Sequence, residues 1–128
     1  MKEHEKTIYG CTIKRYSVKT DFGSAKEVSN FIKKLQGMVK LNSLCLISDD
    51  GNGKDDIVDN IRMSNIQNLE NTMADIISKK IDTVMIDGRY KGKLLATGIH
   101  FKDKNICLYV TDNNGENCDE VARFLEIE

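Results

Sequence analysis

The sequence predicts an α+β fold: a two-layer sandwich in which three helices cover one face of a mainly antiparallel sheet. Two kinds of apolar pattern support this prediction, a 3.6-residue period in three segments and a strand-like alternation in several others. These segments follow the order βαββαβββα, and helices gathered on one face of such a sheet would bury every apolar stripe. With 128 residues the chain has the length of one ordinary domain, so residues 1–128 are expected to form a single unit.

The first predicted strand covers residues 7–18. Tyr9, Cys11 and Ile13 alternate there with polar neighbours, in a segment rich in β-branched residues. The charged residues before this strand, 1–6, are expected to form a flexible tail.

A first helix is predicted over residues 24–36. Ser24 and Glu27 have the capping-box spacing, which satisfies free amide donors at a helix start. Gly37 is typical of a helix end. The apolar residues that follow the helical period are Ala25, Val28, Phe31, Ile32 and Leu35.

The middle of the chain predicts two strands and a second helix. Residues 43–48 form a short apolar run bounded by turn residues, which is typical of a buried strand. Residues 49–56 have the composition of a loop, and for residues 56–63 we favour a strand over an irregular lead-in. A second helix is expected over residues 64–80, because the capping-box spacing recurs at Ser64.

A three-stranded meander and a last helix complete the predicted fold. The expected strands cover residues 83–90, 93–101 and 105–111 and are joined by two short turns. The last helix follows the turn residues 112–115. Its buried residues are predicted to be Cys118, Val121, Ala122 and Leu125.

Charge and hydropathy exclude several function classes. Nineteen basic and twenty acidic residues give a net charge of -1, which excludes a domain that is basic overall, as non-specific nucleic-acid binders usually are. No apolar run approaches the roughly 18–20 residues that span a bilayer. The charged start of the chain lacks the apolar stretch of a secretory signal, so we expect a cytoplasmic protein.

Residue types that carry metal or covalent chemistry are sparse. The two histidines, His4 and His100, form no metal-binding pair and the sequence has no Cys-x-x-Cys motif, so no metal or other cofactor is expected. The glycine-containing segment 50–54 lacks the spacing of a calcium loop and of a phosphate-binding loop. Four widely spaced cysteines are expected to be free, buried thiols: Cys11, Cys45, Cys107 and Cys118.

Clustered acidic residues are the feature most informative about function. Residues 49–59 contain five aspartates against one lysine, and residues 105–128 contain six acids against one arginine. Solvated faces kept charged for solubility are one interpretation of these clusters. The other is a coherent negative surface, which speeds association with a partner of opposite sign.

On the second interpretation, the sequence predicts a small, soluble, non-catalytic interaction protein. It would bind a basic protein partner, as inhibitors and immunity-type proteins bind nucleases and other toxins. The residues expected to bind this partner are Asp49, Asp50, Asp55, Asp56, Asp112, Glu116, Asp119 and Glu120.

Other functions are also compatible with the sequence. A nucleic-acid-binding module would use the basic hairpin Arg89–Lys93, where the Tyr90 ring would stack on a base. A small-ligand or enzyme domain of unknown reaction would use a thiol–imidazole pair of Cys107 with His100. As an acid–base site, the same domain would use Asp87, His100 and Asp112. A homodimer would form through an exposed sheet edge at the first or third meander strand.

Overall fold

A strongly twisted sheet and three helices make up the protein, whose computed structural model describes residues 2–8, 11–19, 22–49, 55–111 and 115–125. The sheet has seven strands in the order β1-β2-β7-β6-β5-β3-β4, and all neighbouring strands are antiparallel. The strands are β1 (Lys2–Ile8), β2 (Cys11–Lys19), β3 (Lys40–Asp49), β4 (Asp55–Arg62), β5 (Thr83–Tyr90), β6 (Lys93–His100) and β7 (Asn105–Thr111). The helices are α1 (Ala25–Gln36), α2 (Leu69–Ser78) and α3 (Gly115–Phe124), and a 3₁₀ turn, η1 (Met63–Asn65), precedes α2.

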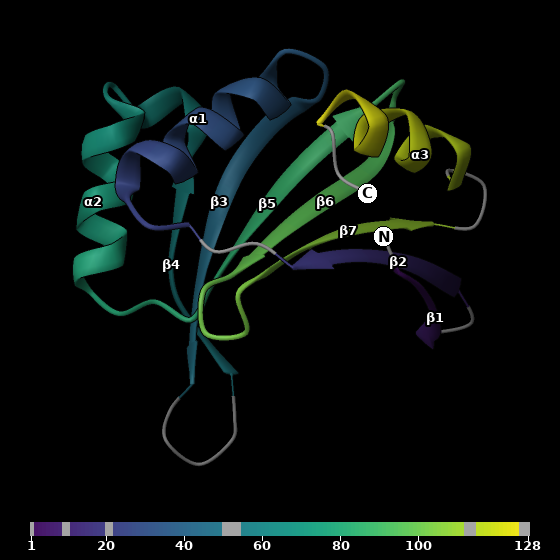
Figure 1. Cartoon of the computed structure of the whole chain (residues 1–128), viewed down its shortest axis with the longest axis horizontal. Helices are drawn as coiled ribbons and strands as arrows, with labels where there is room; N and C mark the ends of the chain where they lie inside the picture. Colours follow the sequence, from purple (N-terminus) through teal and green to yellow (C-terminus); the bar gives the residue numbers. More distant parts are fainter. Residues whose placement is uncertain (1, 9–10, 20–21, 50–54, 112–114, 126–128) are drawn as a thin grey trace.

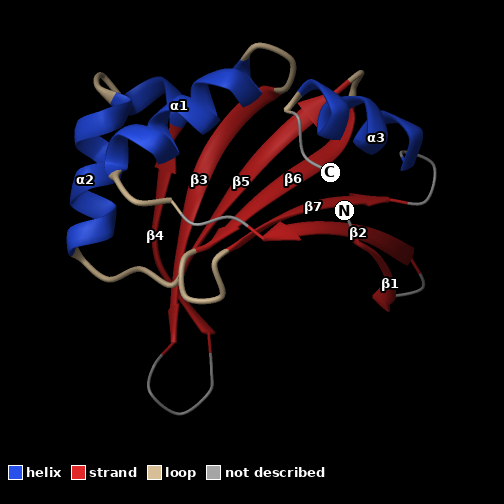
Figure 2. Ribbon diagram, viewed as in Figure 1, coloured by secondary structure: helices blue, strands red, loops and turns tan. Residues whose placement is uncertain are grey.

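The three helices lie on one face of the sheet, as Figures 1 and 2 show. Helices α1 and α2 pack against each other, and α3 lies against β7. The predicted α+β two-layer sandwich with an antiparallel sheet is therefore confirmed. None of the described helices is long and apolar enough to cross a membrane.

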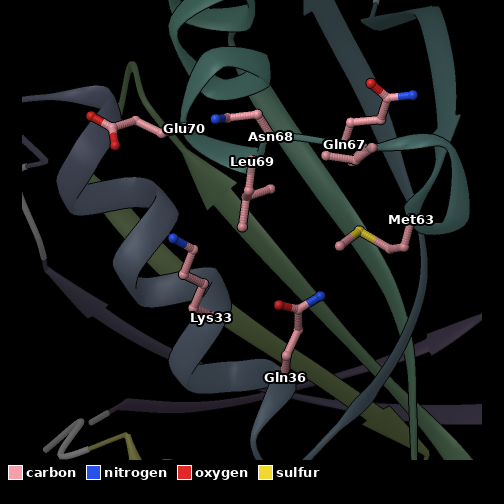
Figure 3. Close-up of a pocket in the computed structure, with 8 residues that line it drawn as sticks. Lys33, Gln36, Met63, Gln67, Asn68, Leu69 and Glu70 are labelled. Atoms are coloured by element: carbon pink, nitrogen blue, oxygen red, sulfur yellow. The ribbon is translucent and has the colours of Figure 1, made fainter.

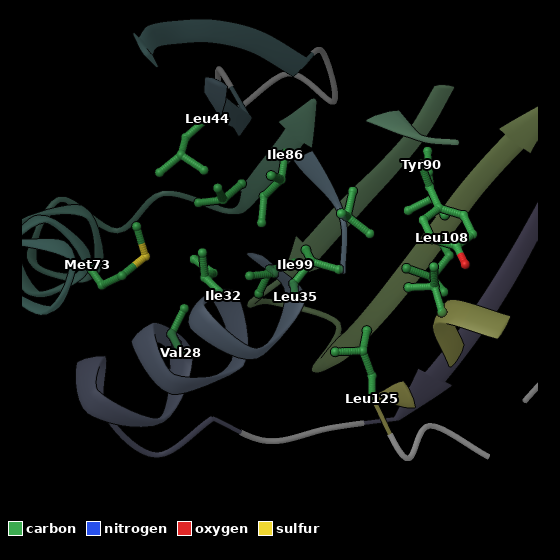
Figure 4. Packing of buried hydrophobic residues seen from close by; sticks show 14 of the residues in the cluster. Val28, Ile32, Leu35, Leu44, Met73, Ile86, Tyr90, Ile99, Leu108 and Leu125 are labelled. Atoms are coloured by element: carbon green, nitrogen blue, oxygen red, sulfur yellow. The ribbon is translucent and has the colours of Figure 1, made fainter. Parts of the chain in front are cut away.

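The hydrophobic core lies between the helices and the sheet (Figure 4). Leu44, Ile86, Thr97 and Leu108 are cross-strand neighbours on β3, β5, β6 and β7, and each is at most 1% exposed. The helices and the residue after α3, Leu125, add the buried side chains Val28, Ile32, Leu35, Met73, Ile76, Val121, Ala122 and Leu125. Burial of one aliphatic side chain of this size contributes roughly 1.5–3 kcal/mol, so this interface holds the two layers together.

The N-terminal segment differs from the prediction. Residues 2–8 form strand β1, which pairs with β2, instead of a tail before one strand over 7–18. The element order is therefore ββαββαβββα. Charged residues are typical of an edge strand, because the outer side of such a strand tolerates them. A flexible tail has a similar composition, so the sequence alone did not distinguish the two.

Helix α1 begins and ends as predicted. Ser24 is its N-cap, and the Glu27 amide donates to Ser24 Oγ at 3.3 Å. Glu27 Oε2 accepts from the Gly23 amide at 3.0 Å, so both side chains of the predicted capping pattern satisfy amides at the helix start.

Helix α2 begins later than predicted. Its N-cap is Asn68, whose Oδ1 accepts from the Asn71 amide at 2.9 Å, so the start at Ser64 is wrong. Ser64 instead lies in η1, and Ile66 has an extended backbone (φ -91°, ψ 115°). Asparagine is at least as strong an N-cap as serine, so the helix can begin after Asn68 and not after Ser64.

Strand β3 is longer than predicted, and β4 begins and ends one residue earlier than predicted. The strand favoured over residues 56–63 is confirmed as β4, and the run 43–48 lies within β3. The loop predicted over 49–56 is wrong at its two ends, because Asp49 and Asp55 are paired residues of these strands. The pairing of β3 with β4 thus extends into a segment whose composition is typical of a turn.

The edges of the sheet are β1 and β4. The edges predicted at the first and third meander strands are wrong, since β5 lies between β6 and β3, and β7 lies between β6 and β2. Strand β2 covers the edge of β7, and β3 covers the edge of β5. Any strand-to-strand contact with another chain must therefore use β1 or β4.

Candidate functional site

The candidate site is the edge strand β4 together with the end of β3 that pairs with it. Asp49 pairs with Asp55, and Ser48 pairs with Asp56, at the end of this two-stranded unit. Figure 1 shows that this end extends away from all three helices. Of Asp49 and Asp55 only the backbone is described, and Asp50 lies outside the described residues.

A β-bulge places two apolar side chains on this edge. Leu46 pairs with Asp59 and Ile47 pairs with Ile57, which leaves Val58 without an opposite residue. Ile57 is 71% exposed and Val58 is 56% exposed. Bulges redirect side chains and increase local twist, and here two adjacent β-branched residues are both accessible.

The acidic side chains described on β4 face solvent. Asp56 and Asp59 are exposed, and no salt bridge between described residues involves either one. The Asn60 amide donates to Asp59 Oδ1 at 2.8 Å, a local bond that occupies one backbone donor of the strand. The edge thus combines negative charge, accessible apolar surface and strand backbone.

The second acidic cluster contains a carboxylate that is bound within the fold. Glu120 on α3 accepts a 2.6 Å hydrogen bond from the Tyr90 hydroxyl and forms a 3.0 Å salt bridge with Lys91. Lys91 and Gly92 have φ angles of 52° and 77°, as a two-residue hairpin turn between β5 and β6 requires. The turn therefore places Lys91 at the helix, and Glu120 ties α3 to the sheet.

These contacts shift three pKa values. The hydrogen bonds from Tyr90 and Lys91 hold the pKa of the Glu120 carboxyl below its usual 4.5. The hydrogen bond to Glu120 raises the pKa of the Tyr90 hydroxyl and of the Lys91 ammonium. The three groups therefore stabilise one another's prevailing protonation states at neutral pH.

The acids that the structure describes in the two clusters do not form one surface. Figure 1 places α3 and the β3–β4 end on opposite sides of the molecule. Asp119 on α3 is exposed, the side chain of Glu116 is not described, and Asp112 lies outside the described residues. The β4 edge, which has two exposed apolar residues beside its aspartates, is the better-defined surface.

The basic hairpin has no free aromatic ring at its tip. Tyr90 is 9% exposed and its hydroxyl is bound to Glu120, so the ring is not accessible for stacking on a base. Lys91 Nζ lies 5.3 Å from the centre of this ring and is paired with Glu120. Glu120, whose negative charge opposes nucleic-acid binding, is therefore in direct contact with this hairpin.

A polar cluster around His100 lies on the sheet face opposite the helices. His100 Nδ1 lies 3.1 Å from Thr83 Oγ1, and His100 Nε2 lies 3.0 Å from Tyr109 Oη. A Cβ atom at Gly98 would lie 2.8 Å from His100 Nε2, so glycine gives the ring its space. An open pocket of about 490 Å³ adjoins the cluster, with Asp82 among its lining residues.

Of the predicted catalytic groups, His100 lines this pocket, Asp87 and Cys107 do not, and Asp112 lies outside the described residues. Asp87 lies four residues beyond Thr83 on β5 and accepts a 3.5 Å hydrogen bond from Asn42. Cys107 pairs with Gly98 and is 3% exposed, which is unlike the partly exposed position of a reactive thiolate. Sequence reasoning missed the contacts of His100 with Thr83 and Tyr109, which depend on the pairing of three strands.

A second open pocket, of about 330 Å³, lies between α1 and the segment that leads into α2. Figure 3 shows Lys33 and Gln36 extending from α1 towards Leu69 and Met63. Apolar side chains and uncharged amides make up most of its lining. Its charged groups, Lys33 and Glu70, are both exposed, so none of its lining residues is a buried charged group.

The part of the chain that the structure describes contains no group of three or more His, Cys, Asp or Glu residues able to hold a metal ion. Neither Cys45 nor Cys107 is in a disulfide; Cys107 is buried, as predicted, and Cys45 is half-buried. The side chains of Cys11 and Cys118 are not described. No protein-family model, no curated protein and no solved structure matches the chain.

Proposed function

We propose that this protein is a non-catalytic interaction module that binds a basic protein partner through the β4 edge, as an inhibitor or immunity-type protein would. One observation carries the proposal: exposed Asp56 and Asp59 flank the exposed apolar residues Ile57 and Val58. Apolar surface supplies affinity on binding, and unpaired acids supply attraction towards a positive partner.

The negative charge of this edge is available to a partner. Residues 49–59 contain five aspartates against Lys54 alone, and the basic residue of β4 is Arg62 at its end. Charges of one sign at a projecting end raise the rate of encounter with an opposite charge, and this effect weakens as salt screens it. Glu120, by contrast, is already bound to Lys91 and Tyr90.

Site-specific photo-cross-linking in the native cell tests the proposal. A photoreactive amino acid replaces Val58 on β4 or, as the control, exposed Ala74 on α2. We expect position 58, and not position 74, to cross-link to a protein at a basic segment. The association rate of the purified pair should fall at least about tenfold between roughly 0.02 M and 0.2 M salt.

Identical cross-links from the two positions, or an association rate that does not change with salt, would contradict the proposed function. A cross-link from position 58 to nucleic acid, and not to a protein, would contradict it as well. The charge-neutral variant Asp59→Asn should slow association, while Asp119→Asn on α3 serves as the matched removal of one exposed acid elsewhere.

A further inference from the structure

We infer, resting on that proposed function, that the partner binds as an extended strand added antiparallel or parallel to β4. The partner segment carries lysine or arginine on either side of apolar β-branched residues. Strand addition takes its affinity from main-chain hydrogen bonds and its specificity from alternate side chains.

The position of β4 in the sheet provides the backbone for such a contact. β4 is at the end of the strand order, so β3 is its one strand neighbour among the described residues. An edge strand presents a row of main-chain donors and acceptors on its outer side. The Asn60 amide is held by Asp59 Oδ1, a bond that a partner carbonyl can replace. Its release frees the Asp59 carboxylate for a lysine or arginine.

The exposed side chains select an apolar strand. Ile57 and Val58 are adjacent, and both are exposed, as are all residues from 56 to 60. Cross-strand pairs of β-branched residues stabilise strand pairing, so an incoming valine or isoleucine has a partner on this edge.

Charge excludes a second copy of this chain as the preferred occupant. If two β4 strands paired antiparallel so that Ile57 of each met Val58 of the other, Asp56 of each would lie opposite Asp59 of the other. Both residues are exposed, and like charges directly opposite each other destabilise strand pairing. A basic segment in the same position meets opposite charges instead.

The other edge of the sheet is less suited to such a partner. The β1 sequence Lys-Glu-His-Glu-Lys carries charges of both signs and ends with one apolar residue, Ile8. The two lysines of this strand, Lys2 and Lys6, would repel a basic segment. The two edges therefore differ, and β4 is the one whose composition matches a basic, apolar strand.

Peptide binding to the full chain tests the inference. The probe is a nine-residue peptide of alternating lysine and valine, and its control is the same peptide with every second amide N-methylated. N-methylation removes strand hydrogen bonds and preserves charge. We expect at least about tenfold weaker binding of the methylated peptide, and slower amide hydrogen exchange in β4 when the unmethylated peptide binds.

Matched protein variants extend this test. Val58→Thr keeps the β-branched shape and should weaken peptide binding several-fold, because an apolar contact is lost. Ile77→Thr changes another exposed apolar residue, which is 39% exposed on α2, and should leave binding unchanged. Circular dichroism of both variants verifies that the fold is retained.

Each contrary result has a distinct meaning. Equal binding of both peptides would overturn strand addition and leave recognition of a basic partner in place. Failure of both peptides to bind at low salt would overturn strand addition together with the proposed function. Sedimentation that shows a dimer of the wild-type chain, lost in Val58→Thr, would overturn the basic partner as occupant in favour of a second copy.

Discussion

Two acidic regions look alike in the sequence, and the fold uses them differently. On α3, Glu120 accepts a 2.6 Å hydrogen bond from the Tyr90 hydroxyl and forms a 3.0 Å salt bridge with the Lys91 ammonium. On β4, Asp56 and Asp59 are exposed and make no described salt bridge. The first region joins a helix to the sheet, whereas the second presents unpaired charge at a sheet edge.

The difference shows that the surroundings of an acid, and not its membership of an acidic run, decide its role. A carboxylate with two donors has a lowered pKa and contributes to folding stability. An exposed carboxylate without a cation contributes little to folding, and its field remains available to other molecules. The apolar residues beside each acid also differ: Val121, next to Glu120, is buried, whereas Val58, next to Asp59, is exposed.

Two valines provide the largest contrast. Val121→Ala on α3 removes two methyl groups from a fully buried site (0% exposed), so we expect a loss of about 2 kcal/mol in the free energy of unfolding. Val58→Ala on β4 changes a residue that is 56% exposed and should alter stability by less than about 0.5 kcal/mol. Urea unfolding measures both values. Equal losses would show that the β4 edge is part of the structural core.

The hydroxyl of Tyr90 provides a smaller contrast. Tyr90→Phe keeps the ring in place and removes the hydrogen bond to Glu120, so the midpoint of thermal unfolding should fall, by less than for Val121→Ala. Removal of this donor also returns the Glu120 pKa towards its usual value. An unchanged midpoint would mean that this hydrogen bond does not contribute to the attachment of α3.

Stability at acid pH reports on the same contact. Because the folded-state pKa of Glu120 is lowered, its stabilisation is fully present above its usual pKa of 4.5 and is lost as pH falls through the folded value. The stability difference between wild type and Glu120→Gln should therefore shrink below pH 4.5. Denaturant unfolding along a pH series measures it, and a difference that grows in acid would contradict the assignment.

Local sequence patterns predicted the elements well where one period dominates. The helix after Ser24 and the three meander strands agree with the structure, because capping, apolar spacing and turn residues act over a few neighbours. Two competing caps explain the error at α2, where Asn68 prevailed over Ser64.

The candidate site required information that local patterns do not contain. The Tyr90–Glu120 contact joins residues 30 positions apart, and the His100 cluster depends on the lateral order of β5, β6 and β7. The sequence did predict the acids of residues 49–59. It did not predict that β4 is a sheet edge, since strand order is set by how the helical connections cross the sheet.

Asp59→Asn, which removes a charge and keeps the shape of the side chain, should have the smallest effect on stability and a clear effect on association with a partner. Asp59→Asn preserves the oxygen that receives the Asn60 amide, so the free energy of unfolding should change by less than about 0.5 kcal/mol. The association rate with a basic partner should still fall several-fold at low salt, because the negative field of the edge is weaker. Glu120→Gln should have the reverse profile, with lower stability and little change in association rate, since its charge is already paired with Lys91. If Asp59→Asn instead lowered stability and left the rate unchanged, the two acids would have the same structural role and the distinction between the regions would fail.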